Sequence, residues 1–209
     1  MDRYLYENYL HILKEELIPA LGCTEPIAIA FTAAYARSVL GKMPEQVRVT
    51  CSGNIVKNVK GVTVPGSGGM KGIEAAAAMG LIAKDYTKKL EILDAITKED
   101  LRSVKRLLQR KIIRCELARQ VDNLYISVLA KSGDESGEVI VSGKHTQVVR
   151  IMKDNRLLWE NRESECEEEN EIGCDKSLLR LGDIFQFVRE VDTEDIAELL
   201  DRQISCNLS

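Results

Sequence analysis

The chain has 209 residues, of which 44% are hydrophobic and 30% charged, so it is long enough and apolar enough to bury a core. Its formal net charge of -4 and its isoelectric point near 5.4 argue against a nucleic-acid surface, which normally needs a basic patch. No apolar run approaches the ~20 residues of a membrane span and the amino terminus does not resemble a signal peptide, so a cytoplasmic protein is expected.

The start of the chain is predicted to be helical. Residues 2–18 place apolar side chains on one helical stripe that ends before Pro19. After a turn at residues 21–23, Thr24 is a good N-cap, and the glutamate and proline that follow suit a first helical turn. This second helix should run to about Leu40, where Gly41 ends it. Its residues are almost all apolar or small, so we place it in the core.

Six cysteines occur in the chain, and no C-x-x-C pattern is among them. Without an export signal, their thiols are expected to stay reduced. Cys51 and Cys115 each lie in an apolar, strand-like segment, which is typical of buried free cysteine. Cys166 and Cys174 are spaced too loosely to indicate a zinc site.

Cys23 differs from the other cysteines because it lies directly before the amino end of a predicted helix. The helix dipole there should lower the pKa of the thiol and favour the thiolate. A thiolate at this place is either a nucleophile or a metal ligand, and an inert cysteine in a turn is the alternative. The residue's position alone does not decide between these readings.

A candidate ligand loop follows the first predicted strand. Residues 47–50 form that strand, residues 52–54 a polar turn, and residues 65–69 a glycine-rich segment before a helix expected from about Met70 to Ala83. Glycines let the backbone adopt positive φ and approach a ligand, and the free N–H groups of a first helical turn favour an anion. The segment is therefore interpreted as a cradle for a phosphate or carboxylate. A tight turn without a ligand is the alternative.

The remaining elements complete an α+β pattern. Thr97 and Asp100 form a capping box for a helix that reaches about Arg110. Alternating β-branched segments then predict an antiparallel meander over residues 112–117, 124–130, 138–142 and 147–152, which residues 156–160 can extend. Residues 161–176 are interpreted as an exposed acidic linker, and helices are expected over residues 178–190 and 195–206. The chain is predicted to be one domain, residues 1–209, with helices packed on a mostly antiparallel sheet.

The two histidines are interpreted differently. His11 lies in the first predicted helix and is assigned a structural role. His145 lies in a turn between two predicted strands, where a lone histidine is usually a surface or hydrogen-bonded residue. Because the pKa of histidine is ordinarily near neutrality, His145 is also a candidate acid or base.

Three segments together resemble one family. LGCTEP at residues 21–26, SGNIVKN at residues 52–58 with GVTVPGSGG at residues 61–69, and GKHT at residues 143–146 occur in this order in the bacterial and archaeal L-cysteine desulfidases, which are relatives of the iron–sulfur L-serine dehydratase α chain. The first two motifs are quite specific and the third is less so. Residues 190–197 also read like the family, so the resemblance covers nearly the whole chain.

The resemblance implies a lyase that converts L-cysteine and water into pyruvate, ammonia and sulfide without pyridoxal phosphate. Such enzymes hold a 4Fe-4S cluster by three cysteines and leave one iron open as a Lewis acid for the substrate. Cys23 matches the family's first cluster ligand. Gly66, Ser67, Gly68 and Gly69 would then hold the substrate carboxylate, and Ser52, Asn54, Asn58 and Thr146 would add hydrogen bonds. We expect His145 to be the base that removes the Cα proton.

The chain departs from this family in length. A full-length member is about twice as long and carries its other two cluster cysteines in a helical carboxy-terminal half. One thiolate cannot hold a cluster, so this chain alone is expected to bind none and to be inactive. It is expected to dock with that missing domain or with a partner subunit through exposed apolar surface, which also favours a homo-oligomer. The alternative function is a non-catalytic module that binds an amino acid or another small carboxylate.

Overall fold

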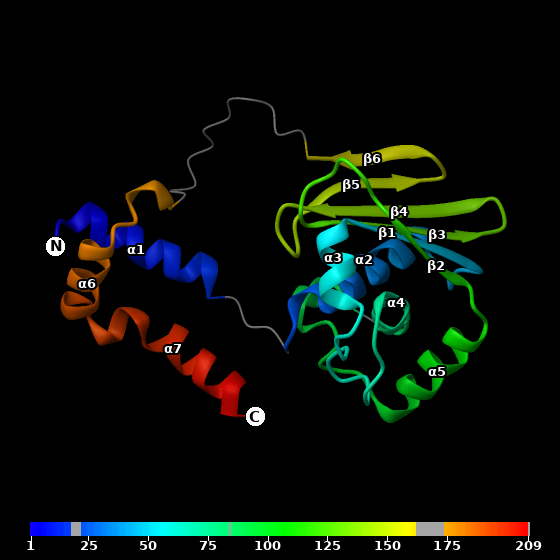
Figure 1. Ribbon diagram of the computed structural model, residues 1–209, viewed down its shortest axis with the longest axis horizontal. Helices are drawn as coiled ribbons and strands as arrows, with labels where there is room; N and C mark the ends of the chain where they lie inside the picture. The colour runs from blue at the N-terminus through cyan, green and yellow to red at the C-terminus, as the bar shows by residue number, and fades with distance from the viewer. Residues whose placement is uncertain (18–21, 84, 162–173, 209) are drawn as a thin grey trace. The chain divides into compact units, whose positions relative to one another are not determined.

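The computed structural model describes residues 1–17, 22–83, 85–161 and 174–208. The sequence predicts one domain, and the described residues gather into two compact units. The larger unit falls within residues 20–163, and the smaller unit combines the two ends of the chain (Figure 1). Of the predicted acidic linker, residues 162–173 lie outside the described residues. Among the described helices, none is long and apolar enough to cross a membrane.

A six-stranded sheet organises the larger unit. Its strand order is β2-β1-β3-β4-β5-β6, and every pair is antiparallel except β1 with β2. The mostly antiparallel sheet of an α+β protein is thereby confirmed. The strand bounds are Gln46–Cys51 for β1, Ile113–Leu117 for β2, Tyr125–Ser132 for β3, Glu135–Ser142 for β4, Val148–Lys153 for β5 and Arg156–Glu160 for β6.

One predicted strand is placed differently from expectation. We expected residues 112–117 to open the antiparallel meander, but β2 instead lies beside β1 and runs parallel to it, with Val49 level with Cys115. β1 thereby separates β2 from β3, and the meander consists of β3 to β6. Several helices lie between β1 and β2 in the chain and make this pairing possible, because parallel neighbours need a long crossover connection.

Alternation along β1 decides which face of the sheet is covered. Val47, Val49 and Cys51 are buried, whereas Gln46 and Arg48 are exposed on the other face. Two helices, α2 (Thr24–Leu40) and α4 (Ile73–Ile82), lie on the buried side (Figure 1). Both are rich in alanine and almost wholly buried, as the sequence predicts for the first of them. α2 ends at Leu40 before the left-handed Gly41, as predicted, but Thr24 is its first residue and not its N-cap, a position that Cys23 occupies.

Helices α2 and α4 approach each other very closely at Gly80. A Cβ atom added to Gly80 would lie 2.0 Å from the carbonyl oxygen of Ala30. Because that oxygen belongs to the backbone, no side-chain movement could relieve the clash. Gly137 of β4 makes a similar approach to α2, where an added Cβ would lie 2.6 Å from the carbonyl oxygen of Ala36. Glycine at these two places therefore sets the distance of α2 from its neighbours on both sides.

Shorter helices complete the larger unit. The predicted polar turn at residues 52–54 is instead the start of a helix, α3 (Gly53–Val59), and the Ser52 side chain caps it by accepting from the Ile55 N–H. The larger unit also contains a 3₁₀ segment, η1 (Tyr86–Glu91). The capping box of Thr97 and Asp100 is confirmed at the start of α5 (Lys98–Gln109), where both reciprocal hydrogen bonds form.

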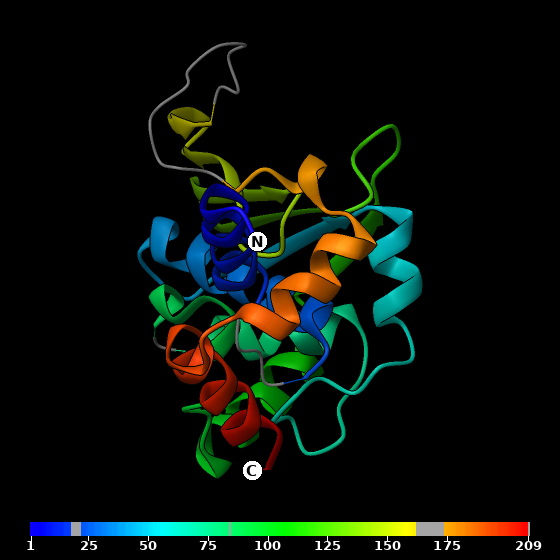
Figure 2. The same cartoon turned by 90° about the vertical axis from the view of Figure 1, so that its left-hand side faces the viewer.

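The smaller unit is helical and joins the chain ends (Figure 2, blue, orange and red). It comprises α1 (Arg3–Glu16), η2 (Lys176–Leu178), α6 (Leu181–Glu190) and α7 (Thr193–Leu208). The rings of Tyr9 and Phe187 meet edge to face in its core, 5.4 Å apart. On α6, Leu181, Phe185 and Val188 are exposed.

Candidate functional site

The three segments that carry the family resemblance meet in the larger unit. Thr24, the first residue of α2, places its Oγ1 atom 3.1 Å from Nε2 of His145, which lies in the turn between β4 and β5. Its neighbour Glu25 accepts a hydrogen bond from the side-chain amide of Asn58 at 3.2 Å, near the end of α3. Residues separated by more than thirty positions are thereby brought to one place. All of these side chains are half-buried, so they border a surface that solvent reaches.

Glu25 is the centre of this cluster, and we did not single it out from the sequence as a site residue. Its carboxylate accepts from the Cys23 thiol at 3.0 Å, from Asn58, and at a longer 3.5 Å from the Thr24 hydroxyl. The thiol hydrogen bond is the largest cause that holds the pKa of Glu25 below its ordinary value, and Asn58 and the nearby His145 act in the same direction. The sequence signal that could have identified Glu25 is its place in the LGCTEP motif, where an acidic residue lies between the cysteine and the proline.

The Cys23 thiol does not behave as its position before the helix suggests. Burial is the largest cause that raises the pKa of Cys23, and the hydrogen bond to the Glu25 carboxylate raises it further. The prediction that the helix dipole lowers this pKa is therefore wrong for the chain as it stands. Burial, together with the adjacent carboxylate, disfavours the negative charge of the thiolate more strongly than the dipole favours it. Cys23 itself occupies the N-cap position but makes no capping hydrogen bond with its side chain.

The glycine-rich segment has the backbone that the sequence predicts. Gly66, Gly68 and Gly69 all have positive φ, at 67°, 69° and 97°. The segment is closed by a β-bridge between Thr63 and Lys71, so it forms a loop of its own. The expectation that it opens the next helix directly is wrong, because α4 begins at Ile73 after Gly72.

The loop nevertheless lies next to the Cys23 segment. A Cβ atom added to Gly22 would lie 3.3 Å from Cγ of Pro65, the residue that begins the PGSGG sequence. Cys23 is therefore the chain neighbour of a residue that packs against the start of the loop. The arrangement would bring a ligand held by the loop into the neighbourhood of the Cys23–Glu25–His145 cluster.

The remaining predicted site residues divide into two groups. Ser52 and Ser67 are buried, and their hydroxyls donate to the carbonyl oxygens of Asn123 and Met70, at 2.6 Å and 3.2 Å, so both shape the backbone. Asn54 is exposed and lies one helical turn before Asn58, on the same face of α3. Thr146 follows His145 in the β4–β5 turn and is half-buried. The predicted site side chains that do not fix the backbone in this way are therefore those of Asn54, Asn58 and Thr146.

The described residues do not fit an iron–sulfur cluster on their own. Among the side chains described in residues 1–17, 22–83, 85–161 and 174–205, no three from histidine, cysteine or acidic residues gather as a metal site. Cys51 is buried on β1, as predicted, but Cys115 on β2 is exposed, so the prediction that it is buried is wrong. The Cys174 thiol of the smaller unit donates to Glu15 at 2.5 Å. Among the side chains that the structure describes, Cys23 is therefore the one thiol at the cluster, which is fewer than the three that a site-differentiated cluster needs.

The thiols of Cys51 and Cys115 are expected to resist alkylation in the folded chain. Burial raises the pKa of Cys51 to about 12. Cys115 is exposed in part, but partial desolvation of its thiol together with the Glu74 carboxylate raises its pKa to about 12. At pH 8 only about one thiol in ten thousand would then be thiolate, and this fraction grows tenfold with each pH unit. Peptide mapping by mass spectrometry after brief iodoacetamide treatment should find both unmodified, whereas the urea-unfolded chain should be modified at both. Equal modification of Cys51 in the two states would contradict the buried geometry.

Comparison with known proteins places the chain beside one group of relatives. It is 44% identical over 203 residues to a UPF0597 protein of Lachnoclostridium phytofermentans. The aligned residues make up 97% of this chain and 48% of the relative. A UPF0597 protein of Finegoldia magna is 43% identical over 202 residues, and one of Treponema denticola is 36% identical over 210, each again with 48% of the relative covered. The chain thus spans about half the length of the curated relatives it matches. No protein-family model and no solved structure matches it.

Proposed function

We propose that this chain, which is homologous to UPF0597 proteins over about half their length, supplies part of the active site of a lyase. The reaction would eliminate sulfide from L-cysteine, or water from L-serine, to give pyruvate and ammonia. One observation carries the proposal: the Thr24–His145 and Glu25–Asn58 contacts join the three segments on which the resemblance to L-cysteine desulfidases rests. Unrelated surface residues would have no reason to converge in this way.

The cluster offers a base for the Cα proton. Because the Thr24 hydroxyl is directed towards Glu25, its oxygen is open to accept from Nε2–H of His145. The neutral imidazole then carries its lone pair on Nδ1, which can take the Cα proton of the substrate. The electron pair of that C–H bond forms the Cα–Cβ double bond while the β-sulfur leaves as hydrosulfide, or while the β-hydroxyl takes the proton back from the imidazolium and leaves as water. The resulting aminoacrylate hydrolyses to pyruvate and ammonia without further help from the protein.

The loop and α3 would hold the substrate during this step. The positive-φ glycines at residues 66, 68 and 69 can direct backbone N–H groups towards the substrate carboxylate, which is the kind of anion that such loops accept. Asn54 and Asn58 present side-chain amides from one face of α3. Asn58 is additionally fixed by Glu25, so its amide is oriented before the substrate arrives.

The iron–sulfur cluster implied by the resemblance would supply Lewis-acid activation of the leaving group. Since the described residues offer Cys23 alone, we derive no step through it. The other ligands would come from a carboxy-terminal domain or a partner subunit, which the additional length of the relatives can provide. The 209-residue chain by itself is proposed to be inactive.

The test is an activity assay with the complementary half. The chain would be co-expressed with the remaining half of the Lachnoclostridium phytofermentans relative, treated anaerobically with iron and sulfide, and assayed for pyruvate from L-cysteine and L-serine. An Asn58→Ala variant should raise KM by about tenfold, because it loses one hydrogen bond to the charged substrate. Asn161→Ala, which removes an exposed amide at the end of β6, is the matched control and should leave KM unchanged. No pyruvate from either amino acid would contradict the proposal.

A non-catalytic amino-acid binding module is the second candidate. The single thiol at Cys23 favours it, because a degenerate site would keep the carboxylate cradle while lacking a full ligand set. Thermal denaturation of the chain alone separates the two functions. Saturable stabilisation by L-cysteine or L-serine without iron, combined with no turnover after reconstitution, would favour the binding module.

A further inference from the structure

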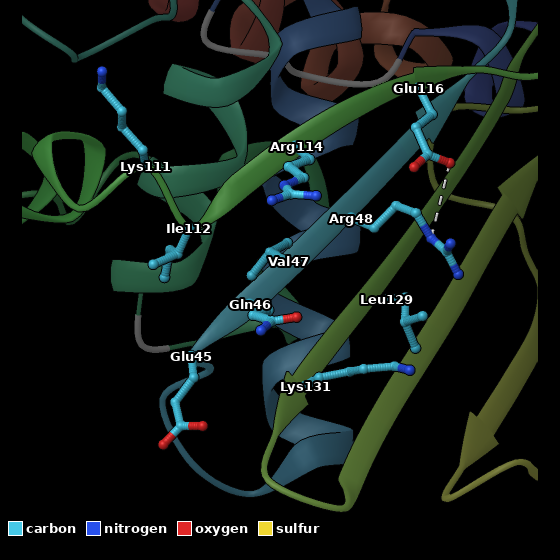
Figure 3. Close-up of a pocket in the computed structure, with 10 residues that line it drawn as sticks. All are labelled: Glu45, Gln46, Val47, Arg48, Lys111, Ile112, Arg114, Glu116, Leu129 and Lys131. Carbon is cyan, nitrogen blue, oxygen red and sulfur yellow. Dashed lines mark ion pairs between the residues drawn. The ribbon is translucent and has the colours of Figure 1, made fainter.

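A cationic hollow lies on the face of the sheet opposite to α2 and α4. Figure 3 shows Arg114, Arg48 and Lys131 on three neighbouring strands, β2, β1 and β3, around a hollow of about 590 Å³. Lys111 lies at its rim and points away from the other three. The hollow surrounds the first half of β1, whereas the candidate lyase site adjoins α3, which follows the end of the same strand. The two are therefore separate features of the larger unit.

Strand pairing forces these cations onto one face. Arg48 is level with Arg114 on β2 and with Leu129 on β3, while Gln46 is level with Lys131. Side chains that are level on neighbouring strands point to the same side, and neighbouring strands lie about 4.8 Å apart. Since Val47 and Val49 face the core, Gln46 and Arg48 must face the hollow. The three cations are consequently fixed beside one another by the backbone.

The charge of this surface is poorly neutralised. Two arginines directly opposite each other repel, which costs stability unless an anion compensates. Two acids also line the hollow. Glu45 accepts from the Gly133 N–H, and the Glu116 carboxylate is 4.0 Å from the Arg48 guanidinium, with both of these side chains 52% exposed, so that the pair contributes little. Within the described part of the chain, Arg114 and Lys131 form no ion pair. A chain of net charge -4 thus gathers unpaired cations at one place, where they would attract an anion.

We propose that this hollow binds an oligophosphate group, either free or as part of a nucleotide. The planar forks of Arg48 and Arg114 match phosphate oxygens in pairs, and Lys131 adds a point charge. Adjacent guanidinium groups suit a ligand that carries several negative charges in a row better than one with a single carboxylate. Gln46 and the half-buried Leu129 offer an amide and an apolar contact for any organic part of the ligand.

Isothermal titration calorimetry of the 209-residue chain tests this proposal. Sodium tripolyphosphate and ATP would be titrated separately at low salt, with citrate as a carboxylate of similar charge. We expect saturable binding of tripolyphosphate, weakened by salt, and at least tenfold weaker binding to an Arg48→Gln/Arg114→Gln double variant. Tighter binding of ATP than of tripolyphosphate would identify a nucleotide as the source of the oligophosphate, and equal binding would identify the free oligophosphate.

The matched control removes the same charge elsewhere. Arg102→Gln/Lys105→Gln changes two exposed cations on α5, outside the hollow, and should leave the affinity within twofold of the parent. Circular dichroism should show unchanged melting for both double variants. An absence of saturable binding, equal loss in the two double variants, or equal binding of citrate would overturn the proposal. None of these outcomes depends on lyase activity, so the test is independent of the function proposed above.

Discussion

Replacing Gly80 with alanine is expected to destabilise the larger unit by about 3 kcal/mol, at the upper end for overpacking. The new methyl group would lie 2.0 Å from the carbonyl oxygen of Ala30, and 2.6 Å from its Cα. Both atoms belong to the backbone of α2, so the clash can be relieved only by moving one helix away from the other. Such a movement would open the alanine-lined contact between α2 and α4, which is almost wholly buried.

Urea denaturation followed by circular dichroism measures this loss. Gly61→Ala is the matched control, since a Cβ atom there meets nothing within 4 Å and the residue needs no positive φ. The control should change the free energy of unfolding by less than about 0.5 kcal/mol. A Gly80→Ala variant as stable as the Gly61→Ala variant would show that α2 and α4 do not pack as closely as described.

The second large effect is expected at His145. If its imidazole removes the Cα proton, His145→Ala should lower kcat of the reconstituted lyase by about a hundredfold or more, with a smaller change in KM. Thr24→Val removes the hydroxyl that orients the ring, together with its longer hydrogen bond to Glu25, so it should lower kcat by about tenfold and leave the protein folded. Pyruvate formation from L-cysteine measures both variants under anaerobic conditions.

His11→Ala provides the control for His145. His11 lies on α1 in the smaller unit, whereas Thr24, Glu25 and Asn58 belong to the larger unit. Its replacement should leave kcat unchanged. A reconstituted enzyme in which His145→Ala and His11→Ala turn over at equal rates would remove His145 from the proposed chemistry and leave another group as the base.

Local signals predicted much of the fold. The capping box at Thr97 and the closing Gly41 each depend on residues within a few positions, and both are found as expected, whereas the N-cap of α2 is Cys23 and not the predicted Thr24. The meander of β3 to β6 was also predictable, because its strands are joined by short turns. In each case the side chain that determines the structure is close in sequence to the backbone that it affects.

Non-local relations escaped prediction. The parallel pairing of β2 with β1 joins segments separated by α3, α4 and α5, and alternation cannot identify a strand's partner. Helix α3 has only seven residues and begins with glycine and asparagine, which resemble a turn. The central position of Glu25 follows from contacts with Asn58, and the raised pKa of Cys23 follows from burial and from Glu25. These features depend on the folded chain.

The central claim is that Cys23 and the side chains around it form half of a lyase active site. Its most direct test compares pyruvate formation from L-cysteine by the intact chain and by a Cys23→Ala variant, each reconstituted anaerobically with the remaining half of the Lachnoclostridium phytofermentans relative. We predict sustained turnover with Cys23 and none above background with alanine. Equal turnover by the two, or none by either when iron and sulfide are bound, would contradict the claim.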